Sequence, residues 1–124
     1  MEEQDVYSLI GEAGFQNLVA RFYGRVPEDD ILGPLYRDHD LAGAEQRLRD
    51  FLIFRFGGPA RYIEQRGHPR LRMRHAQFAI SHPVRDRWLR LMAGALADTE
   101  MPAEVKQLLW TYFEGTATAM INQS

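Results

Sequence analysis

The sequence predicts an all-α protein that folds as a single domain over residues 1–124. Three observations support this prediction: apolar residues recur at helical spacing in four segments, no linker or internal repeat divides the chain, and 124 residues suit one domain. Hydrophobic residues make up 45% of the chain and charged residues 26%, as in ordinary globular proteins. A chain of this size buries about two-thirds of the surface that its unfolded form exposes, so it can form a core without cross-links.

Four segments have the apolar spacing of an amphipathic helix, and each has a recognisable boundary. The first segment ends at Pro27 and the second at Gly57-Gly58-Pro59, while the third and fourth begin at Pro83 and Pro102. Their stripes are, in order, Phe15, Leu18, Val19, Phe22 and Val26; Ala44, Leu48, Phe51, Leu52 and Arg55; Val84, Trp88, Leu91, Met92, Ala95 and Leu96; and Val105, Leu108, Leu109, Tyr112, Phe113, Thr116, Met120 and Ile121.

Two further segments are less regular. Residues 31–40 contain Gly33 and Pro34 and predict a short helix or a turn. Residues 59–81 form a long irregular stretch in which residues 70–75 alternate basic and apolar side chains, and this alternation taken alone indicates a strand. A connection of about 20 residues without structure of its own is unusual in a compact domain and is often functional. We therefore look for the chemistry of the protein in this second segment.

Arginine is concentrated in the middle of the chain. Residues 1–46 hold ten acidic and three basic side chains, whereas residues 47–90 hold eleven basic and three acidic ones. Such a segment either faces an anionic group or forms a solvated surface with local ion pairs. The sequence has no cysteine, no apolar run of about 18 residues and no signal-peptide pattern. These absences exclude disulfides and thiolate metal sites, and they favour a cytoplasmic protein without a membrane span.

The four histidines stand in different contexts, and no pair has the i, i+4 spacing of a helical zinc site. His39, His68 and His82 fit a solvated loop, a turn before proline and a helix N-terminus, respectively. His75 is different, because a short helix in this segment would place it on the same apolar face as Leu71. It is then either a hydrogen-bonded core residue or a metal ligand.

Three polar aromatic residues, Tyr23, Tyr36 and Trp88, stand where leucine or phenylalanine would serve a core that needs only volume. Buried tyrosine hydroxyls and indole N–H groups must find hydrogen-bond partners. Several such donors aimed at one cavity would suit an anionic or strongly polarised guest.

Taken together, motifs from about Val6 to Asn122 resemble the group II truncated haemoglobins in order and spacing. They are Arg21-Phe22-Tyr23, Asp40-Leu41-Ala42-Gly43-Ala44-Glu45, Gly57-Gly58-Pro59 with Tyr62, Gly67-His68-Pro69-Arg70-Leu71-Arg72-Met73-Arg74-His75, and Asp86-Arg87-Trp88-Leu89. The resemblance implies a truncated globin, a two-over-two helical sandwich around haem, and it replaces the strand reading with a short helix that bears the iron ligand. One departure is that the family's Gly-Gly pair between its first two helices is here Gly11 followed by Glu12.

The resemblance also assigns the residues of the site. His75 matches the proximal ligand of haem b, and Tyr23, Tyr36 and Trp88 match distal residues that donate hydrogen bonds to the bound ligand. Ala44 takes the place where longer globins carry a distal histidine, so it supplies no donor. The resemblance assigns the haem propionates to Arg47, Tyr62 and Arg74, and the other haem contacts to Ala44, Leu48, Phe51, Leu71, Phe78, Ile80 and Met92.

The implied function is a haem protein that binds dioxygen and other small gaseous ligands and releases them slowly, for transport, storage or sensing. An alternative on the same haem is peroxidase or nitric oxide dioxygenase activity that draws electrons from an external reductase. A nucleic-acid-binding module using Arg70, Arg72 and Arg74 is disfavoured, because the isoelectric point is about 6.1 and such modules are strongly basic. Nothing in the sequence decides between a monomer and a homodimer.

Overall fold

A computed structural model describes residues 1–123, and these contain helices and no strands. A short 3₁₀ helix, η1, spans Glu3–Asp5 and leads into the first α-helix. The α-helices are α1 (Val6–Gly24), α2 (Leu32–Tyr36), α3 (Leu41–Arg55), α4 (Arg61–Arg66), α5 (Leu71–Arg74), α6 (His82–Asp98) and α7 (Ala103–Ala119). No helix in this part of the chain is long and apolar enough to cross a membrane.

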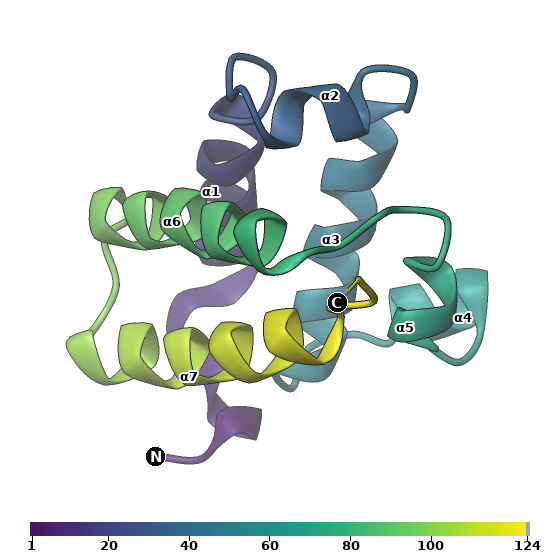
Figure 1. The fold of residues 1–124 in the computed structure, drawn as a ribbon. Helices are drawn as coiled ribbons and strands as arrows, with labels where there is room; N and C mark the ends of the chain where they lie inside the picture. The colour runs from purple at the N-terminus through teal and green to yellow at the C-terminus, as the bar shows by residue number, and fades with distance from the viewer. Residues whose placement is uncertain (124) are drawn as a thin grey trace.

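Four long helices form two layers. Helices α6 and α7 lie side by side in front of α1 and α3 and run across them (Figure 1). The core between the layers contains the apolar stripes predicted from the sequence, and its largest fully buried side chains include Phe15, Phe22, Phe56, Leu52 and Leu109. This arrangement confirms the predicted all-α fold with a two-over-two globin topology.

Helix α1 changes direction at Gly11. This glycine has φ +65° and ψ −177°, a conformation that interrupts the helix and that side chains with a Cβ rarely adopt. The turn between the first two globin helices, where the sequence lacks the usual Gly-Gly pair, is thus made by one glycine.

A close backbone approach joins the start of the chain to the end of α3. The Tyr7 N–H donates a hydrogen bond of 3.0 Å to the Phe56 carbonyl. At Gly57, which has φ +99°, a Cβ would lie 2.1 Å from the Gln4 carbonyl oxygen. Only glycine fits this turn, and the turn directs the chain toward α4 and α5.

Residues 59–81 differ from the regular parts of the fold. They contain two short helices, α4 and α5, so the strand suggested by the alternation in residues 70–75 is wrong. The alternating apolar residues do not share a buried face: Leu71 is half-buried, whereas Met73 is 61% exposed. Helix α5 follows Arg70, whose φ of +42° lies in the left-handed region.

Candidate functional site

Two adjoining pockets lie among α2, α3, α5 and α6. The first is bounded largely by apolar side chains and extends to α7, and the second opens past α4. The two pockets share seven lining residues, so we treat them as one cavity with two lobes. The shared residues are Tyr36, Leu48, Phe51, Leu71, His75, Phe78 and Trp88.

His75 follows α5 directly and lines both lobes of the cavity. Its Nδ1 atom lies 2.7 Å from the carbonyl oxygen of Leu71. A carbonyl only accepts hydrogen bonds, so this contact places a ring proton on Nδ1, and in the neutral imidazole the free lone pair is then on Nε2. Fixing one imidazole nitrogen on a backbone carbonyl is the usual way to orient a histidine that binds a metal through the other.

The segment that carries His75 is held by side-chain bonds to the backbone rather than by long helices. The guanidinium carbon of Arg74 lies 5.9 Å from the centroid of the Tyr62 ring. Its Nε and Nη2 atoms donate hydrogen bonds to three carbonyls, those of Pro69 (2.7 Å), Arg66 (2.7 Å) and His68 (3.3 Å). Because a four-residue helix cannot stabilise itself, these bonds keep the segment folded. We call residues 67–81 the proximal segment.

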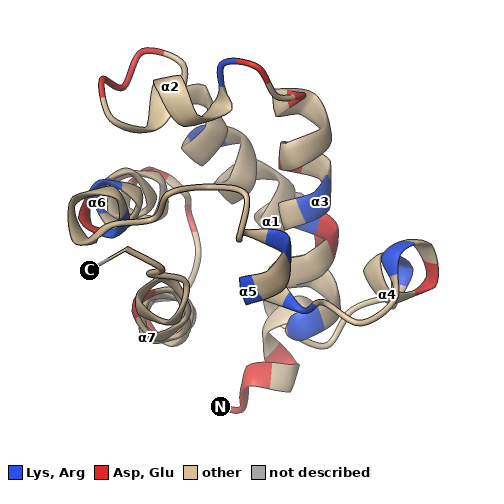
Figure 2. Cartoon of the chain, turned by 45° about the vertical axis from the view of Figure 1, so that its right-hand side comes forward, with Lys and Arg blue, Asp and Glu red and all other residues tan. Residues whose placement is uncertain are grey.

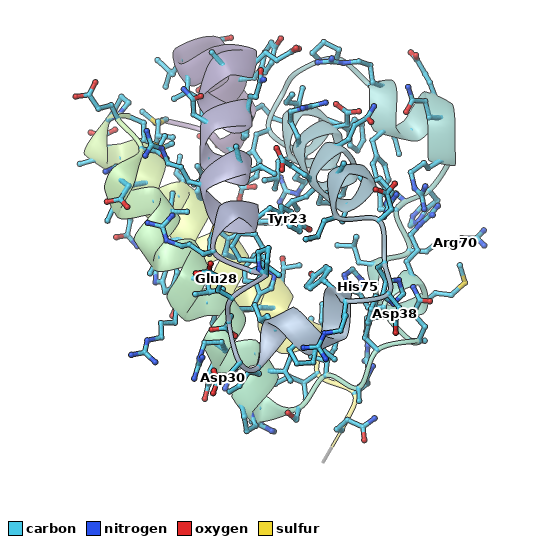
Figure 3. All side chains as sticks on the ribbon, turned by 90° about the horizontal axis from the view of Figure 1, so that it is seen from above. Tyr23, Glu28, Asp30, Asp38, Arg70 and His75 are labelled. Carbon is cyan, nitrogen blue, oxygen red and sulfur yellow. The ribbon has the colours of Figure 1, made fainter. Side chains whose placement is uncertain are left out.

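Across the cavity stand three polar aromatic residues from different helices, which we call the distal group: Tyr23, Tyr36 and Trp88. Figure 3 shows Tyr23 near the end of α1 and His75 toward the side of the molecule that carries Arg70. The centroids of the Tyr23 and Tyr36 rings are 5.9 Å apart. The Phe22 ring centroid lies 5.0 Å from that of Tyr23 and 5.0 Å from that of Trp88. The distal group is therefore built into the aromatic core.

Burial changes the acidity of the two distal tyrosines. Tyr23 is 8% exposed, and burial raises the pKa of its hydroxyl, with a further contribution from the Tyr36 hydroxyl. Burial likewise raises the pKa of Tyr36, although its contact with the Tyr23 hydroxyl acts in the opposite direction. Both side chains thus keep their protons and can donate hydrogen bonds at physiological pH.

Asp29 anchors the short helix that carries Tyr36. Its Oδ2 accepts from the backbone N–H groups of Ile31 (3.0 Å) and Leu32 (2.7 Å), and its Oδ1 accepts from Arg87 on α6 at 2.7 Å. Burial acts to raise the pKa of the Asp29 carboxyl, but the Leu32 N–H and Arg87 hold it below its ordinary value. The carboxylate therefore stays charged and fixes α2 against α6.

The cavity brings together nearly all of the site residues predicted from the sequence. Arg47, Tyr62 and Arg74 line the open lobe with Ala44 and Tyr23, and Ile80 lines the apolar lobe. The exception is Met92, which is fully buried but is absent from the described lining of both lobes. Met92 thus packs in the core beside the cavity, and its assignment as a haem contact stays a prediction.

Several lining residues were not predicted. Arg66, His39 and Gln77 line the open lobe, and Leu35, Thr116 and Met120 are among those that line the apolar lobe. Thr116 and Met120 were already visible in the apolar stripe of the last helix, so that stripe could have identified them. The other residues come from short connections, where no periodicity marks the inward face.

The arginines of the central segment fall into two groups. Arg49, Arg55, Arg61, Arg85 and Arg87 form ion pairs with Asp or Glu, so local pairing is the correct description for them. Within residues 1–123 no such pair involves Arg47, Arg90, Arg66 at the end of α4, or Arg70, Arg72 and Arg74 at α5. Basic residues mark α4, α5 and the neighbouring part of α3 (Figure 2).

The geometry suits haem. An apolar cavity holds one imidazole with a free Nε2, hydrogen-bond donors stand across from it, and arginines lie at the open lobe where propionates would need cations. A globin with this two-over-two topology is the class of protein that the fold and site define.

Comparisons with known proteins place the chain more closely. Residues 5–122 match the family model of the bacterial-like globins. The group 2 truncated hemoglobin YjbI of Bacillus subtilis is 36% identical over 118 residues, covering 95% of this chain and 89% of that protein. The chain therefore belongs to the bacterial-like globins and, within them, to the group II truncated haemoglobins. Globins of this kind bind haem and small gaseous ligands such as dioxygen.

Solved structures support the same placement. A thermostable hemoglobin from Thermobifida fusca is 47% identical with a TM-score of 0.90, covering 94% of this chain and 96% of that one. A truncated oxygen-avid haemoglobin from Bacillus subtilis is 36% identical with a TM-score of 0.89, covering 94% and 98% of the two chains.

Proposed function

We propose that this chain binds haem b through His75 Nε2 and retains dioxygen by hydrogen bonds from the distal group. The observation that carries the proposal is the His75 Nδ1 contact of 2.7 Å with the Leu71 carbonyl, which leaves the other ring nitrogen free beside the cavity. Haem supplies the iron at which small diatomic ligands bind. The oxygen-avid character stated for the Bacillus subtilis relative favours dioxygen as the ligand of this chain as well.

The distal group holds the ligand. Dioxygen bound in a globin is strongly polarised, so donors that face it slow its release. The hydroxyls of Tyr23 and Tyr36 remain protonated, since the pKa of each is raised by burial. The Trp88 indole N–H only donates. Each such hydrogen bond contributes about 0.5–1.5 kcal/mol, and more when the acceptor is charged.

The open lobe binds the propionates. Arg47 and Arg66 line it and form no ion pair within the described residues. Arg74 commits its Nε and Nη2 atoms to backbone carbonyls, so it acts mainly by shaping the lobe. We therefore assign the propionates to Arg47 and Arg66, with the Tyr62 hydroxyl as a further donor.

Replacement of His75 by glycine tests the haem assignment. The His75→Gly variant should lose the Soret spectrum of the wild-type protein, and added imidazole should restore it by filling the space of the deleted ring. His39→Gly is the matched control, because His39 also lines the open lobe but lies on an exposed loop. An unchanged spectrum in His75→Gly without imidazole would exclude His75 as the ligand.

Dioxygen release tests the distal group. Trp88→Phe and Tyr36→Phe should each speed release by about 2- to 10-fold, the kinetic equivalent of one lost hydrogen bond. Stopped-flow measurement with an oxygen scavenger gives the rate. If neither variant changes it, the donors do not face the ligand.

Peroxidase or nitric oxide dioxygenase activity is a second candidate, because a donor-rich cavity also polarises an O–O bond. It requires an external reductase. Peroxide turnover measured in the same two variants separates it from simple binding: turnover that falls with Trp88→Phe or Tyr36→Phe favours the enzyme.

A further inference from the structure

The residues that follow α7 are bonded to the proximal segment. The Asn122 side chain accepts at Oδ1 from the Ile80 N–H (2.8 Å) and donates from Nδ2 to the Phe78 carbonyl (2.9 Å). The backbone N–H groups of Asn122 and Gln123 both donate to the Ile80 carbonyl, at 2.9 and 3.1 Å. In Figure 1 the yellow end of the chain lies beside the connection between α5 and α6.

The chemistry of these contacts fixes the orientation of the Asn122 amide. A backbone N–H only donates and a carbonyl only accepts, so Oδ1 must face Ile80 and Nδ2 must face Phe78. Asparagine carries both a donor and an acceptor at this position, which neither alanine nor aspartate can do.

Residues 121–123, which we call the strap, also contact the part of the chain that precedes His75. Arg72, on α5, donates from Nη2 to the Ile121 carbonyl at 3.4 Å. The strap therefore contacts the chain both before His75, at Arg72, and after it, at Phe78 and Ile80.

The clamped residues form part of the cavity wall. Phe78 lines both lobes, and its ring centroid lies 6.3 Å from that of His75. Ile80 lines the apolar lobe and is 8% exposed. Between α5 and α6 no helix fixes these residues. The Phe78 N–H donates to the His75 carbonyl at 3.0 Å, and the strap supplies the bonds to the Phe78 carbonyl and to both backbone groups of Ile80.

We propose that Asn122 is a positioning residue for the haem: it holds Phe78 beside His75 and Ile80 in the cavity wall, and so controls haem retention and the iron–histidine bond. This inference rests on the proposed function. Partners hydrogen-bonded to a metal ligand commonly change metal affinity about 10- to 100-fold when replaced, and Asn122, which acts on His75 through Phe78, should lie at the lower end of this range.

Haem loss and the iron–histidine vibration of the haem-loaded protein test the clamp. Asn122→Ala should transfer haem to excess apomyoglobin about 10-fold faster than the wild type. It should also shift the iron–histidine stretching band in the resonance Raman spectrum of the ferrous, ligand-free form. A merely structural residue would lower stability without moving this band.

Two further variants complete the design. Asn122→Asp has nearly the same shape but sets a carboxylate oxygen against the Phe78 carbonyl, so it should lose haem at least as fast as Asn122→Ala, and it serves if the alanine variant fails to fold. Gln123→Ala is the matched control, because it keeps the backbone N–H that donates to Ile80. It removes only the 3.3 Å bond from Gln123 Nε2 to Asn122 Oδ1, so it should change haem loss and the band position much less than Asn122→Ala does.

The outcomes separate the two proposals. If the wild type shows no His75-dependent haem, the proposed function fails and the clamp fails with it. If the wild type holds haem through His75 and both Asn122 variants keep its band position and its haem-loss rate, the clamp alone is overturned. A band shift in Gln123→Ala equal to that of Asn122→Ala would also overturn the assignment to the Asn122 side chain.

Discussion

Tyr23 and Trp88 of the distal group and the proximal segment face the same cavity but are held in place by different means. Tyr23 and Trp88 stand on long helices and pack against Phe22, which is fully buried. His75 follows a four-residue helix in a segment fixed by bonds from Arg74 and Asn122 to backbone groups.

This difference predicts that substitutions on the two sides affect different properties, folding stability on one side and haem retention on the other. Loss of packing beneath the distal group should cost folding free energy, because the same side chains form the core between the layers. Loss of a bond in the proximal segment should leave the four long helices intact and weaken the hold on haem instead. Segments with few buried apolar contacts open more readily than core helices, which is consistent with this expectation.

Truncation of an aromatic ring on each side gives the largest expected effect. Phe22→Ala should lower the free energy of unfolding by about 3–5 kcal/mol, because it leaves a cavity beside Tyr23 and Trp88. Phe78→Ala, in the half-buried proximal segment, should cost less than about 2 kcal/mol but speed haem loss. Urea unfolding of the haem-loaded proteins followed by far-ultraviolet circular dichroism measures the first effect. Equal costs for the two variants would refute the comparison.

Alkaline pH should destabilise the distal side. The pKa values of Tyr23 and Tyr36 are raised by burial, so above about pH 10 the unfolded chain releases phenolic protons that the folded chain retains. The unfolded state then binds fewer protons, and stability falls by up to about 1.4 kcal/mol per pH unit for each tyrosine.

Unfolding curves between neutral and strongly alkaline pH measure this dependence. Tyr23→Phe and Tyr36→Phe should each remove their part of the slope, whereas Arg74→Ala should leave it unchanged. Burial also raises the pKa of Tyr112, so a smaller slope should remain in the double phenylalanine variant. A slope that is undiminished in that variant would show that groups other than Tyr23 and Tyr36 cause it.

The smallest effect concerns backbone strain in the proximal segment. Arg70 has φ +42° and its side chain points away from the fold (Figure 3), so Arg70→Gly should stabilise the protein by about 0.5–1 kcal/mol. Arg72→Gly, two residues on within α5, should instead destabilise it by about 1 kcal/mol. Thermal unfolding of both variants gives the comparison, and a destabilised Arg70→Gly would contradict it.

The sequence predicts the two sides of the cavity unequally, for the same physical reason. Long helices repeat their apolar residues, and proline and glycine mark their ends, so the helices that carry Tyr23 and Trp88 follow from periodicity. Helices α4 and α5 have six and four residues, too few for a periodic signal. The alternation in residues 70–75 therefore indicates a strand when it is taken alone, and the short helix is predicted only by the family resemblance.

The bonds that position His75 leave no sequence pattern. Arg74 and Asn122 act on backbone carbonyls and N–H groups, and any segment of chain offers those partners. Met92 shows what periodicity cannot predict. Its helical spacing correctly identifies a buried face, but spacing does not say whether that face meets the cavity or a neighbouring helix.

Gly57 has a consequence for how the sequence can diverge. Structures that share 36–47% of their residues with this chain keep its fold, so most positions have drifted. A Cβ at position 57 would lie 2.1 Å from the Gln4 carbonyl, and no neighbouring side-chain change relieves a clash with backbone. In any lineage that keeps the first residues of the chain against this turn, selection holds position 57 at glycine while the surrounding surface remains free to change.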